Sequence, residues 1–446
     1  MMKFTVRKST ITLALSLLLF KLVLDWAYVY VVSPFYAYAG FTVFLQPWAL
    51  LESYLLTFCL GLLVPSRIEK PSHFFLWLLA VGTIIPSLTY YAIHSGSRAY
   101  MYMLVLSFIF VMVMSDLPPL KIGSLKEGRS MGIGLLLAAV ILVAASMIAK
   151  GGLSHFNLDL SRVYEHRRDV GVLIGTGFWG YLNNWAFKVI NPALMGWAFW
   201  RKKMSLVLAF TGLQVVFFGI SSHKAVLFYP AAILAVYLFA ERRRGLHLMT
   251  WGLIGVVLAS SACSVLFDYH WLSSLFIRRG FLLPAQLNFV YHELFSQMGH
   301  VFMSNSVLAW LFDYPFHVKP VLLVSEYLYG HHDTWANNGF LATGYMHFGY
   351  AGMIIFSIIV GMLLWLADIL VRKRIPVWLG ISILIVPFYS LFVSADLTTA
   401  LLTHGILPGM FILFIIGKKP VFAGKEMRQG GSHAAYLPSQ FGAQPD

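Results

Sequence analysis

Long apolar segments recur along this chain and limit what it can fold into. A helix that crosses a bilayer needs about 20 residues, and stretches near that length follow one another from end to end. They fall at about 9–32, 48–65, 73–94, 98–116, 131–149, 170–200, 204–220, 224–240, 247–268, 346–370, 376–395 and 398–417. The sequence therefore predicts an all-α fold, a polytopic membrane helix bundle of about twelve transmembrane helices.

The composition agrees with a membrane protein. Charged residues make up only 11% of the chain and hydrophobic residues 59%, whereas a soluble domain has about 25% charged residues. The two cysteines, Cys59 and Cys263, both lie within apolar segments. Two such residues exclude a disulfide framework and a cysteine-based metal site.

The positions of the basic residues predict the orientation. A net charge of +14 could indicate nucleic acid, but the positive residues form short clusters at helix ends, which favours a role in membrane topology and no nucleic-acid partner. With the N-terminus in the cytoplasm, all these clusters lie on the inner side: Arg67 and Lys70; Lys121, Lys126 and Arg129; 201–203; 242–244; 372–374; Lys418 and Lys419. We therefore expect a multi-pass protein with both termini in the cytoplasm.

One long interval, 269–345, cannot lie in lipid because it mixes arginines, histidines, carboxylates and asparagines with aromatic residues. We expect it to form short amphipathic helices that lie on the membrane surface and cap an active site. The transmembrane domain then spans 1–420 and includes this cap. The remaining residues, 421–446, are rich in Gly, Ser, Gln and Pro and predict a disordered C-terminal tail.

A second set of basic residues falls on the outer side or within the membrane, where the topology rule disfavours positive charge. Lys21 can be neutralised by Asp25 one helical turn away. Four outer segments each present cations, which would surround an anion if they converged, and Arg binds phosphate oxygens in a bidentate manner. The predicted ligands of a diphosphate are Arg98, Arg162, Arg167, Arg168, Lys224, Arg278 and Arg279. The alternative is that each residue snorkels or pairs locally, for example Arg162 with Glu165.

Four stretches resemble a known family in their order along the chain. They are LDLSRVYEHRRD, FGISSHKAVLFYPA, IRRGFLLPAQLNFVYHELFS and WANNGFLATGYMHFGYAGMIIF, within about 155–370. This order is similar to that of the Wzy O-antigen polymerases, which join oligosaccharide repeat units of bacterial surface polysaccharides. The last stretch resembles the family's Asn-x-Gly approach to a Gly-x-x-Gly helix entry, here Gly349 and Gly352, and it adds Asn337 and Asn338 as substrate-binding residues.

The resemblance implies a function and a location. The chain would be a membrane glycosyltransferase of the bacterial inner membrane that polymerises undecaprenyl-diphosphate-linked repeat units into O-antigen or a similar polysaccharide, with 269–345 as a periplasmic loop. Membrane lipid, a chain-length regulator and a flippase are the further partners it implies. No Asp-x-Asp or Glu-x-Asp pair occurs in the outer loops, and arginines and lysines can stabilise a leaving diphosphate in place of a metal. We therefore expect a metal-independent enzyme without a cofactor.

The acceptor hydroxyl in such a reaction needs a base. The run of His331, His332 and Asp333 lies closest to the asparagine-rich helix entry, and an Asp beside a His can orient it and raise its basicity. Glu326 and His317 in the same cap are the reserve candidates. The His-His-Asp trio could instead bind a metal, although adjacent residues rarely chelate one ion.

Two other functions remain open from the sequence. An O-antigen ligase would transfer the glycan to lipid A-core, but ligase-like members place a histidine beside the asparagine where this chain has Ala336. A transporter or flippase for the same lipid-linked glycan would be expected to show internal symmetry, and we find no convincing repeat.

Overall fold

The computed structural model describes residues 8–123, 125, 127–152, 154, 156–159, 177–221 and 224–417, with Lys224 described by its backbone alone. Every regular element in these ranges is helical. The expected tail at 421–446 lies outside the described residues.

The first half of the chain contributes short and long helices separated by tight turns. Its elements are α1 (Lys8–Ala27), η1 (Tyr28–Val32), α2 (Ser33–Tyr36), η2 (Ala37–Ala39), α3 (Pro47–Leu63), α4 (Pro71–Leu79), η3 (Ala80–Ile84), α5 (Ile85–His94), α6 (Arg98–Ser115), α7 (Gly128–Ala149), α9 (Gly177–Trp185), η4 (Ala186–Ile190), α10 (Asn191–Trp200) and α11 (Met204–Ser221). Proline is the first residue of α3, α4 and α16 (Pro320–Tyr329), each preceded by extended backbone, where its missing N–H leaves no helical bond unmade.

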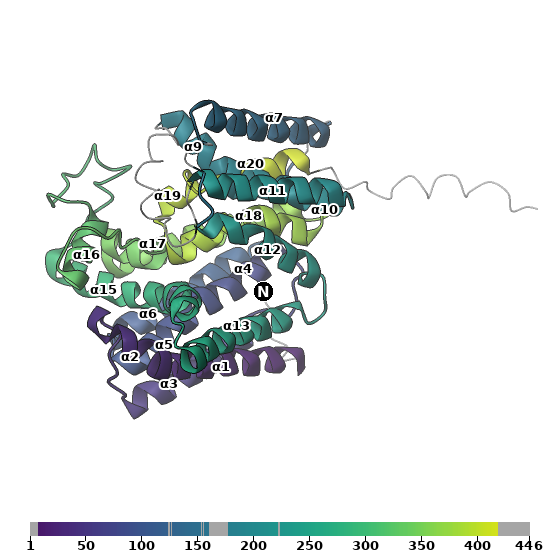
Figure 1. Cartoon of the computed structure of the whole chain (residues 1–446). Helices are drawn as coiled ribbons and strands as arrows, with labels where there is room; N and C mark the ends of the chain where they lie inside the picture. The colour runs from purple at the N-terminus through teal and green to yellow at the C-terminus, as the bar shows by residue number, and fades with distance from the viewer. Residues whose placement is uncertain are drawn as a thin grey trace, which may run out of the picture.

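The second half continues in the same way. Its elements are α12 (Lys224–Phe239), α13 (Gly245–Phe267), α14 (Trp271–Ser273), η5 (Ser274–Leu282), α15 (Leu283–Met298), α16 (Pro320–Tyr329), α17 (Phe340–Val371), α18 (Val377–Val393), α19 (Leu397–Leu401) and α20 (Ile406–Ile416). Figure 1 shows most of the longer helices running side by side across the view, while α16 lies at the left end next to α15 and α17.

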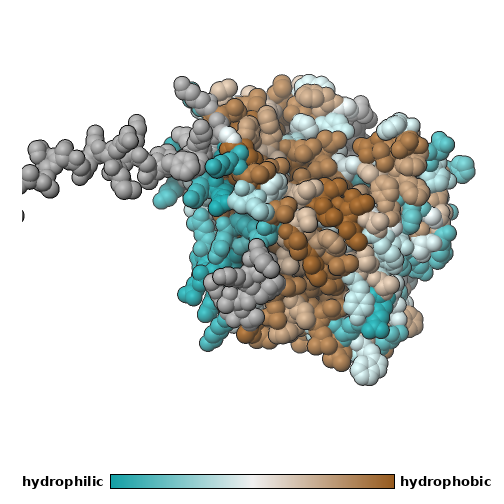
Figure 2. Space-filling view, turned by 180° about the vertical axis from the view of Figure 1, so that it is seen from behind, coloured by the Kyte–Doolittle hydropathy of each residue, from teal (hydrophilic) through white to brown (hydrophobic). Residues whose placement is uncertain are grey.

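The prediction of a helical membrane bundle is confirmed at the level of its helices. In the described part of the chain, eight helical segments are long and apolar enough to cross a membrane: Lys8–Ala39, Pro71–His94, Arg98–Ser115, Gly128–Ala149, Met204–Ser221, Gly245–Phe267, Phe340–Val371 and Leu397–Ile416. Shorter apolar helices occur at Pro47–Leu63, Ala225–Phe239 and Val377–Val393. Figure 2 shows an apolar surface band between two hydrophilic ends, as lipid on the flanks and water at both ends require.

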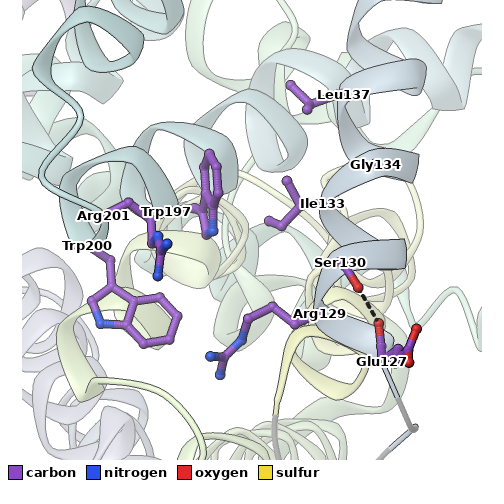
Figure 3. Close-up of a pocket in the computed structure, with 9 residues that line it drawn as sticks. All are labelled: Glu127, Arg129, Ser130, Ile133, Gly134, Leu137, Trp197, Trp200 and Arg201. Atoms are coloured by element: carbon purple, nitrogen blue, oxygen red, sulfur yellow. Dashed lines mark hydrogen bonds between the residues drawn. The ribbon is translucent and has the colours of Figure 1, made fainter.

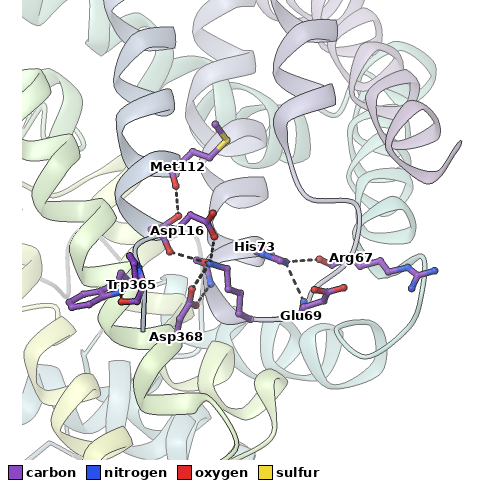
Figure 4. Close-up of polar contacts among 11 residues, drawn as sticks. Arg67, Glu69, His73, Met112, Asp116, Trp365 and Asp368 are labelled. Carbon is purple, nitrogen blue, oxygen red and sulfur yellow. Dashed lines mark hydrogen bonds and ion pairs between the residues drawn. The ribbon is translucent and has the colours of Figure 1, made fainter. Parts of the chain in front are cut away.

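One hydrophilic end carries the basic clusters of the sequence. There the Lys70 ammonium lies 3.1 Å from a carboxylate oxygen of Asp116 and 3.2 Å from one of Asp368 (Figure 4). Asp368 also accepts hydrogen bonds from the backbone N–H and the hydroxyl of Ser72, at 2.8 and 2.7 Å. These contacts join the starts or ends of α4, α6 and α17, and we call this end of the bundle the basic end.

The pairing predicted for Lys21 is confirmed. Its ammonium is buried and lies 2.6 Å from a carboxylate oxygen of Asp25. The other carboxylate oxygen accepts a hydrogen bond of 2.6 Å from the Thr89 hydroxyl, and the ring of Tyr54 covers the ammonium at 4.2 Å. Both charges are therefore satisfied inside the bundle, which is what makes them tolerable there.

The helix α17 is broken near its start. Phe348 and Gly349 have non-helical backbone angles, and Gly349 has φ of 61°, a left-handed conformation that favours glycine. A side chain on Gly352 would overlap the carbonyl oxygen of Gly344. In a straight helix these two residues would be about 12 Å apart. The segment 340–347 therefore folds back against the long helix that follows it.

Replacing Gly352 with alanine is expected to lower the free energy of unfolding by about 1–3 kcal/mol, because the new methyl group meets rigid backbone. The measurement is the thermal unfolding temperature of the purified protein in detergent. Gly252 in α13 is the matched control, because no heavy atom lies within 4 Å of the position its Cβ would take. Equal unfolding temperatures for the two alanine variants would contradict the folded-back arrangement.

Candidate functional site

The interval 269–345 lies at the end of the bundle opposite the basic end, but one of its helices is buried. We expected amphipathic helices on the membrane surface. Instead α15 packs against α17 and α5, and its residues 284–291 are buried. Its polar side chains are used inside the protein: Gln286 donates to the carbonyl of Ala39 at 2.7 Å, and Asn288 donates to the Ser87 hydroxyl at 3.0 Å. These hydrogen bonds offset part of the cost of burying a helix with polar residues, and the buried Oε1 of Gln286 has no partner among the described residues.

The asparagine-rich turn before α17 is anchored to α15. The buried side-chain amide of Asn338 donates to the carbonyl of Pro284 at 3.1 Å and to the side-chain oxygen of Asn288 at 3.0 Å. A Cβ on Gly339 would overlap the carbonyl oxygen of Phe392. Asn338 thus positions the turn, whereas the neighbouring Asn337 is exposed and able to reach a ligand.

The histidine run predicted as the base follows α16 on the exposed surface. The Nδ1 of His332 lies 3.3 Å from the carbonyl oxygen of Leu322, and its Nε2 lies 3.5 Å from a carboxylate oxygen of Glu326. Both ring nitrogens therefore face acceptors, and in the neutral tautomer with its proton on Nδ1 the basic nitrogen would be Nε2. A proton taken up by Nε2 would leave an imidazolium beside the Glu326 carboxylate, which stabilises it.

The other members of this set have different surroundings. His331 has its Nδ1 3.7 Å from a carboxylate oxygen of Asp333 and its ring stacked on Tyr329, with centroids 6.0 Å apart. Asp333 is almost fully exposed, with 93% of its side-chain surface accessible. His317 is exposed in the loop before α16. The structure thus brings His331, His332, Asp333 and Glu326 to one end of α16 and leaves His317 at the other.

Two of the predicted phosphate ligands, Arg278 and Arg279, lie in η5 near the same end of α16. The guanidinium of Arg278 covers the ring of Tyr36 at 4.2 Å, and one of its terminal nitrogens donates to the Ser274 hydroxyl at 3.4 Å. Its buried Nε has no hydrogen-bond partner among the described residues. Burial and the neighbouring positive charge of Arg279 lower the pKa of Arg278.

Tyr329 connects these arginines to the histidine run. Burial raises the pKa of Tyr329, while the nearby charges of Arg278 and Arg279 oppose that rise. Because Tyr329 also stacks on His331, the arginines and the candidate bases belong to one neighbourhood. We call Tyr36, Arg278, Arg279, Tyr329 and His331 the arginine–tyrosine cluster.

Arg98 has a separate partner. Its Nε and one terminal nitrogen lie 3.2 and 2.8 Å from Oε1 of Glu52, which also accepts a hydrogen bond from Tyr102. The other carboxylate oxygen of Glu52, Oε2, accepts one of 2.7 Å from Tyr91. No contact in the described ranges joins Arg98 to the arginine–tyrosine cluster. The remaining predicted ligands, Arg162, Arg167, Arg168 and the side chain of Lys224, lie outside what the structure describes.

A histidine–aspartate pair that the sequence did not single out lies at the break in α17. The Nε2 of buried His347 is 2.9 Å from a carboxylate oxygen of Asp396, and its Nδ1 accepts a hydrogen bond of 3.2 Å from the backbone N–H of Met303. With both ring nitrogens engaged, His347 holds the loop, the helix break and the start of α19 together. The only sequence signal for Asp396 is its position before a helix, where its side chain caps the N–H of Thr398 at 2.9 Å.

This pair makes the stability of the protein depend on pH. Burial would raise the pKa of Asp396, but the hydrogen bond from His347 and the bonds from Thr398 together lower it below the ordinary value. A carboxylate with a lowered folded-state pKa stabilises the protein above its unfolded pKa, about 3.9, and this stabilisation is lost as the pH falls through the folded-state pKa.

Replacing Asp396 with asparagine is therefore expected to lower the free energy of unfolding at pH 7 by about 1.5–3 kcal/mol, the contribution of hydrogen bonds to a charged group. The difference between the variant and the native protein should shrink below pH 4. Thermal unfolding in detergent between pH 3 and pH 8 measures both. A difference that stays constant over this range would show that the charge of Asp396 does not contribute.

Comparison with protein-family models, curated proteins and solved structures finds no match to this chain. Within the described ranges, no group of three or more His, Cys, Asp or Glu side chains could hold a metal ion. The candidate site is therefore defined by its own geometry: a pair of arginines, a tyrosine surround and a partly exposed histidine with an adjacent glutamate.

Proposed function

We propose that this protein is a polyprenyl-diphosphate-dependent glycosyltransferase, an O-antigen-type polymerase that extends a lipid-linked oligosaccharide. The observation that carries the proposal is the half-buried Arg278, whose Nε lacks a partner in the described structure while its neighbour is a second arginine. A guanidinium in such surroundings favours a bound anion, because the anion supplies both charge and acceptors.

The proposed orientation follows from the basic end. Positive residues mark the cytoplasmic side of membrane proteins, so the arginine–tyrosine cluster faces the periplasm and both termini face the cytoplasm of a bacterial inner membrane. About twelve spans result when the segment Gly177–Trp200 and the three shorter apolar helices are added to the eight long ones. The cluster then lies where the diphosphate of an outer-leaflet lipid would reach it.

The proposed reaction assigns a role to each part of the site. The hydroxyl of the acceptor sugar attacks the anomeric carbon of the donor, a carbon–oxygen bond forms, and the bond from that carbon to the diphosphate oxygen breaks. Arg278 and Arg279 stabilise the negative charge on the departing lipid diphosphate. The Nε2 of His332 takes the hydroxyl proton, and the carboxylate of Glu326, at 3.5 Å, stabilises the imidazolium that results.

His347 is the weaker candidate for the base although it is closer to the helix entry. Its Nδ1 already accepts a hydrogen bond from Met303, and its Nε2 donates to Asp396. It would have to break one of these buried contacts before it could accept a proton. The side chain of His332 is 44% exposed, and its Nε2 lies 3.5 Å from the Glu326 carboxylate, a longer contact than the 2.9 Å between His347 and Asp396.

The proposal is tested by incubating the purified protein with a polyprenyl-diphosphate-linked oligosaccharide and identifying the lipid-linked products by mass spectrometry. Products that grow by whole repeat units identify a polymerase. Transfer that occurs only when lipid A-core is supplied identifies a ligase. Transbilayer movement of an unchanged substrate in vesicles identifies a flippase.

A further inference from the structure

The basic end contains a pocket that the proposed reaction does not use. It has a volume of about 630 Å³ and is lined by Glu127, Arg129, Ser130, Ile133, Gly134, Leu137, Trp197, Trp200 and Arg201 (Figure 3). The first turns of α7 form one wall and the end of α10 forms the other. Glu127, Ser130, Gly134 and Arg201 are exposed, so the pocket opens to the surface.

Arg129 is held rigidly at one side of this pocket. Its Nε donates to the carbonyl of Ile416 at 3.0 Å, and a terminal nitrogen donates to the carbonyl of Arg374 at 3.2 Å. Its guanidinium also covers the ring of Trp200 at 4.6 Å. A guanidinium has five N–H groups, and the hydrogen bonds within the described structure use two of them. Arg129 is thus fixed in place with donors left for a ligand.

A second positive charge lies at the mouth. Arg201 is exposed and lines the same pocket. The carboxylate of Glu127 is directed away from both arginines in Figure 3, and the positive end of the α7 helix dipole lies on this wall. The mouth of the pocket is therefore suited to an anion.

The inner part of the pocket is apolar. Ile133 and Leu137 on α7 and Trp197 on α10 line it, and no heavy atom lies within 4 Å of the position that a Cβ on Gly134 would take. Met131 and Leu135 on the adjacent face of α7 are 70% and 58% exposed, as expected for residues in contact with lipid. An apolar channel beside the lipid-facing surface suits an acyl chain better than a water-soluble anion.

We propose that this pocket binds an anionic phospholipid, with the headgroup phosphate between Arg129 and Arg201 and an acyl chain along Gly134 and Leu137. Basic pockets between transmembrane helices at the cytoplasmic side are suited to anionic headgroups, and tryptophans at this depth interact with the interface. The bound lipid would tie α7 to α10 and stabilise this flank of the bundle.

The test titrates the purified full-length protein in detergent with phosphatidylglycerol and follows bound lipid by native mass spectrometry and stability by thermal unfolding. Phosphatidylglycerol is expected to bind and to raise the unfolding temperature, while phosphatidylcholine binds at least about fivefold more weakly. Arg201→Gln is expected to weaken the binding of phosphatidylglycerol about fivefold, which corresponds to the contribution of one charge near an anionic lipid. Gly134→Leu places a side chain where the acyl chain would lie, and it is also expected to weaken the binding of phosphatidylglycerol.

Matched variants make the outcome decisive. Arg243→Gln removes an exposed basic residue that does not line the pocket, and Gly252→Leu adds a side chain to an open helix face. Both should bind phosphatidylglycerol like the native protein. Equal binding of the two phospholipids, or equal effects of Arg201→Gln and Arg243→Gln, would overturn the proposal. Stabilisation by inorganic phosphate alone, unchanged in Gly134→Leu, would overturn the lipid assignment.

Discussion

Replacing Arg278 with methionine is expected to lower the rate of glycan chain extension by about 100-fold or more, the usual loss when a group that stabilises developing negative charge is removed. Methionine keeps an unbranched side chain but lacks the guanidinium, which carries the charge and the donors and covers the ring of Tyr36 at 4.2 Å. Folding should be little affected, because the buried Nε of Arg278 has no partner in the described structure to lose and the hydrogen bond to Ser274 is long, at 3.4 Å. The measurement is the rate of product formation in the reconstituted reaction.

Two further variants separate charge from geometry. Arg278→Lys keeps the charge but lacks the bidentate arrangement of donors, and it should retain part of the activity. Arg243→Met at the basic end removes an exposed arginine that lies far from the arginine–tyrosine cluster in the sequence, and it should be fully active. If Arg278→Met and Arg243→Met extended chains at the same rate, the diphosphate site would have to be placed elsewhere.

Replacing His332 with alanine is expected to reduce chain extension by about 10²–10⁴-fold, the range that a positioned general base contributes. Protein level and the amount of lipid-linked substrate should not change, because His332 is exposed and contacts only Leu322 and Glu326 within the described structure.

The reserve residues provide the comparison for this prediction. Glu326→Gln keeps the shape of the side chain but removes the charge that would stabilise the protonated His332, so an intermediate loss is expected. His317→Ala, at the other end of α16, should be active. Normal long-chain polymer from His332→Ala together with loss in Glu326→Ala or His317→Ala would move the base to that residue.

The fold was predictable from the sequence where the physical cause is local. Apolar segments of bilayer length specify helices, and the stretches expected to span the membrane are mainly helical where they are described; the last one is interrupted at 402–405, between α19 and α20. The pairing of Lys21 with Asp25 was predictable because the two residues are one helical turn apart. The break at Gly349 was not predicted, because no proline marks it and the contact of Gly344 with Gly352 that accompanies it is visible only in the structure.

The candidate site was only partly predictable, because its contacts join residues far apart in the chain. The sequence identified Arg278, Arg279 and the histidine run, but their connection through Tyr329 depends on how η5 and α16 pack. The pair of His347 with Asp396 links residues separated by 49 positions, and no spacing rule predicts such a pair. The motif around Asn338 predicted a substrate-binding residue, but in the structure its side chain is buried and anchors the turn to α15.

The central claim is that this protein transfers a glycan from a lipid diphosphate at the arginine–tyrosine cluster. Mass spectrometry of the lipid fraction tests it most directly, after the purified protein in lipid nanodiscs has been incubated with a polyprenyl-diphosphate-linked oligosaccharide, beside the Arg278→Met variant. The account predicts products of two, three and more repeat units on one lipid, one free polyprenyl diphosphate released for each bond formed, and about 100-fold less of both products from the variant in the same time. The account would be contradicted if the native protein bound the substrate but left it unchanged. It would also be contradicted if the native protein and the variant formed equal amounts of product.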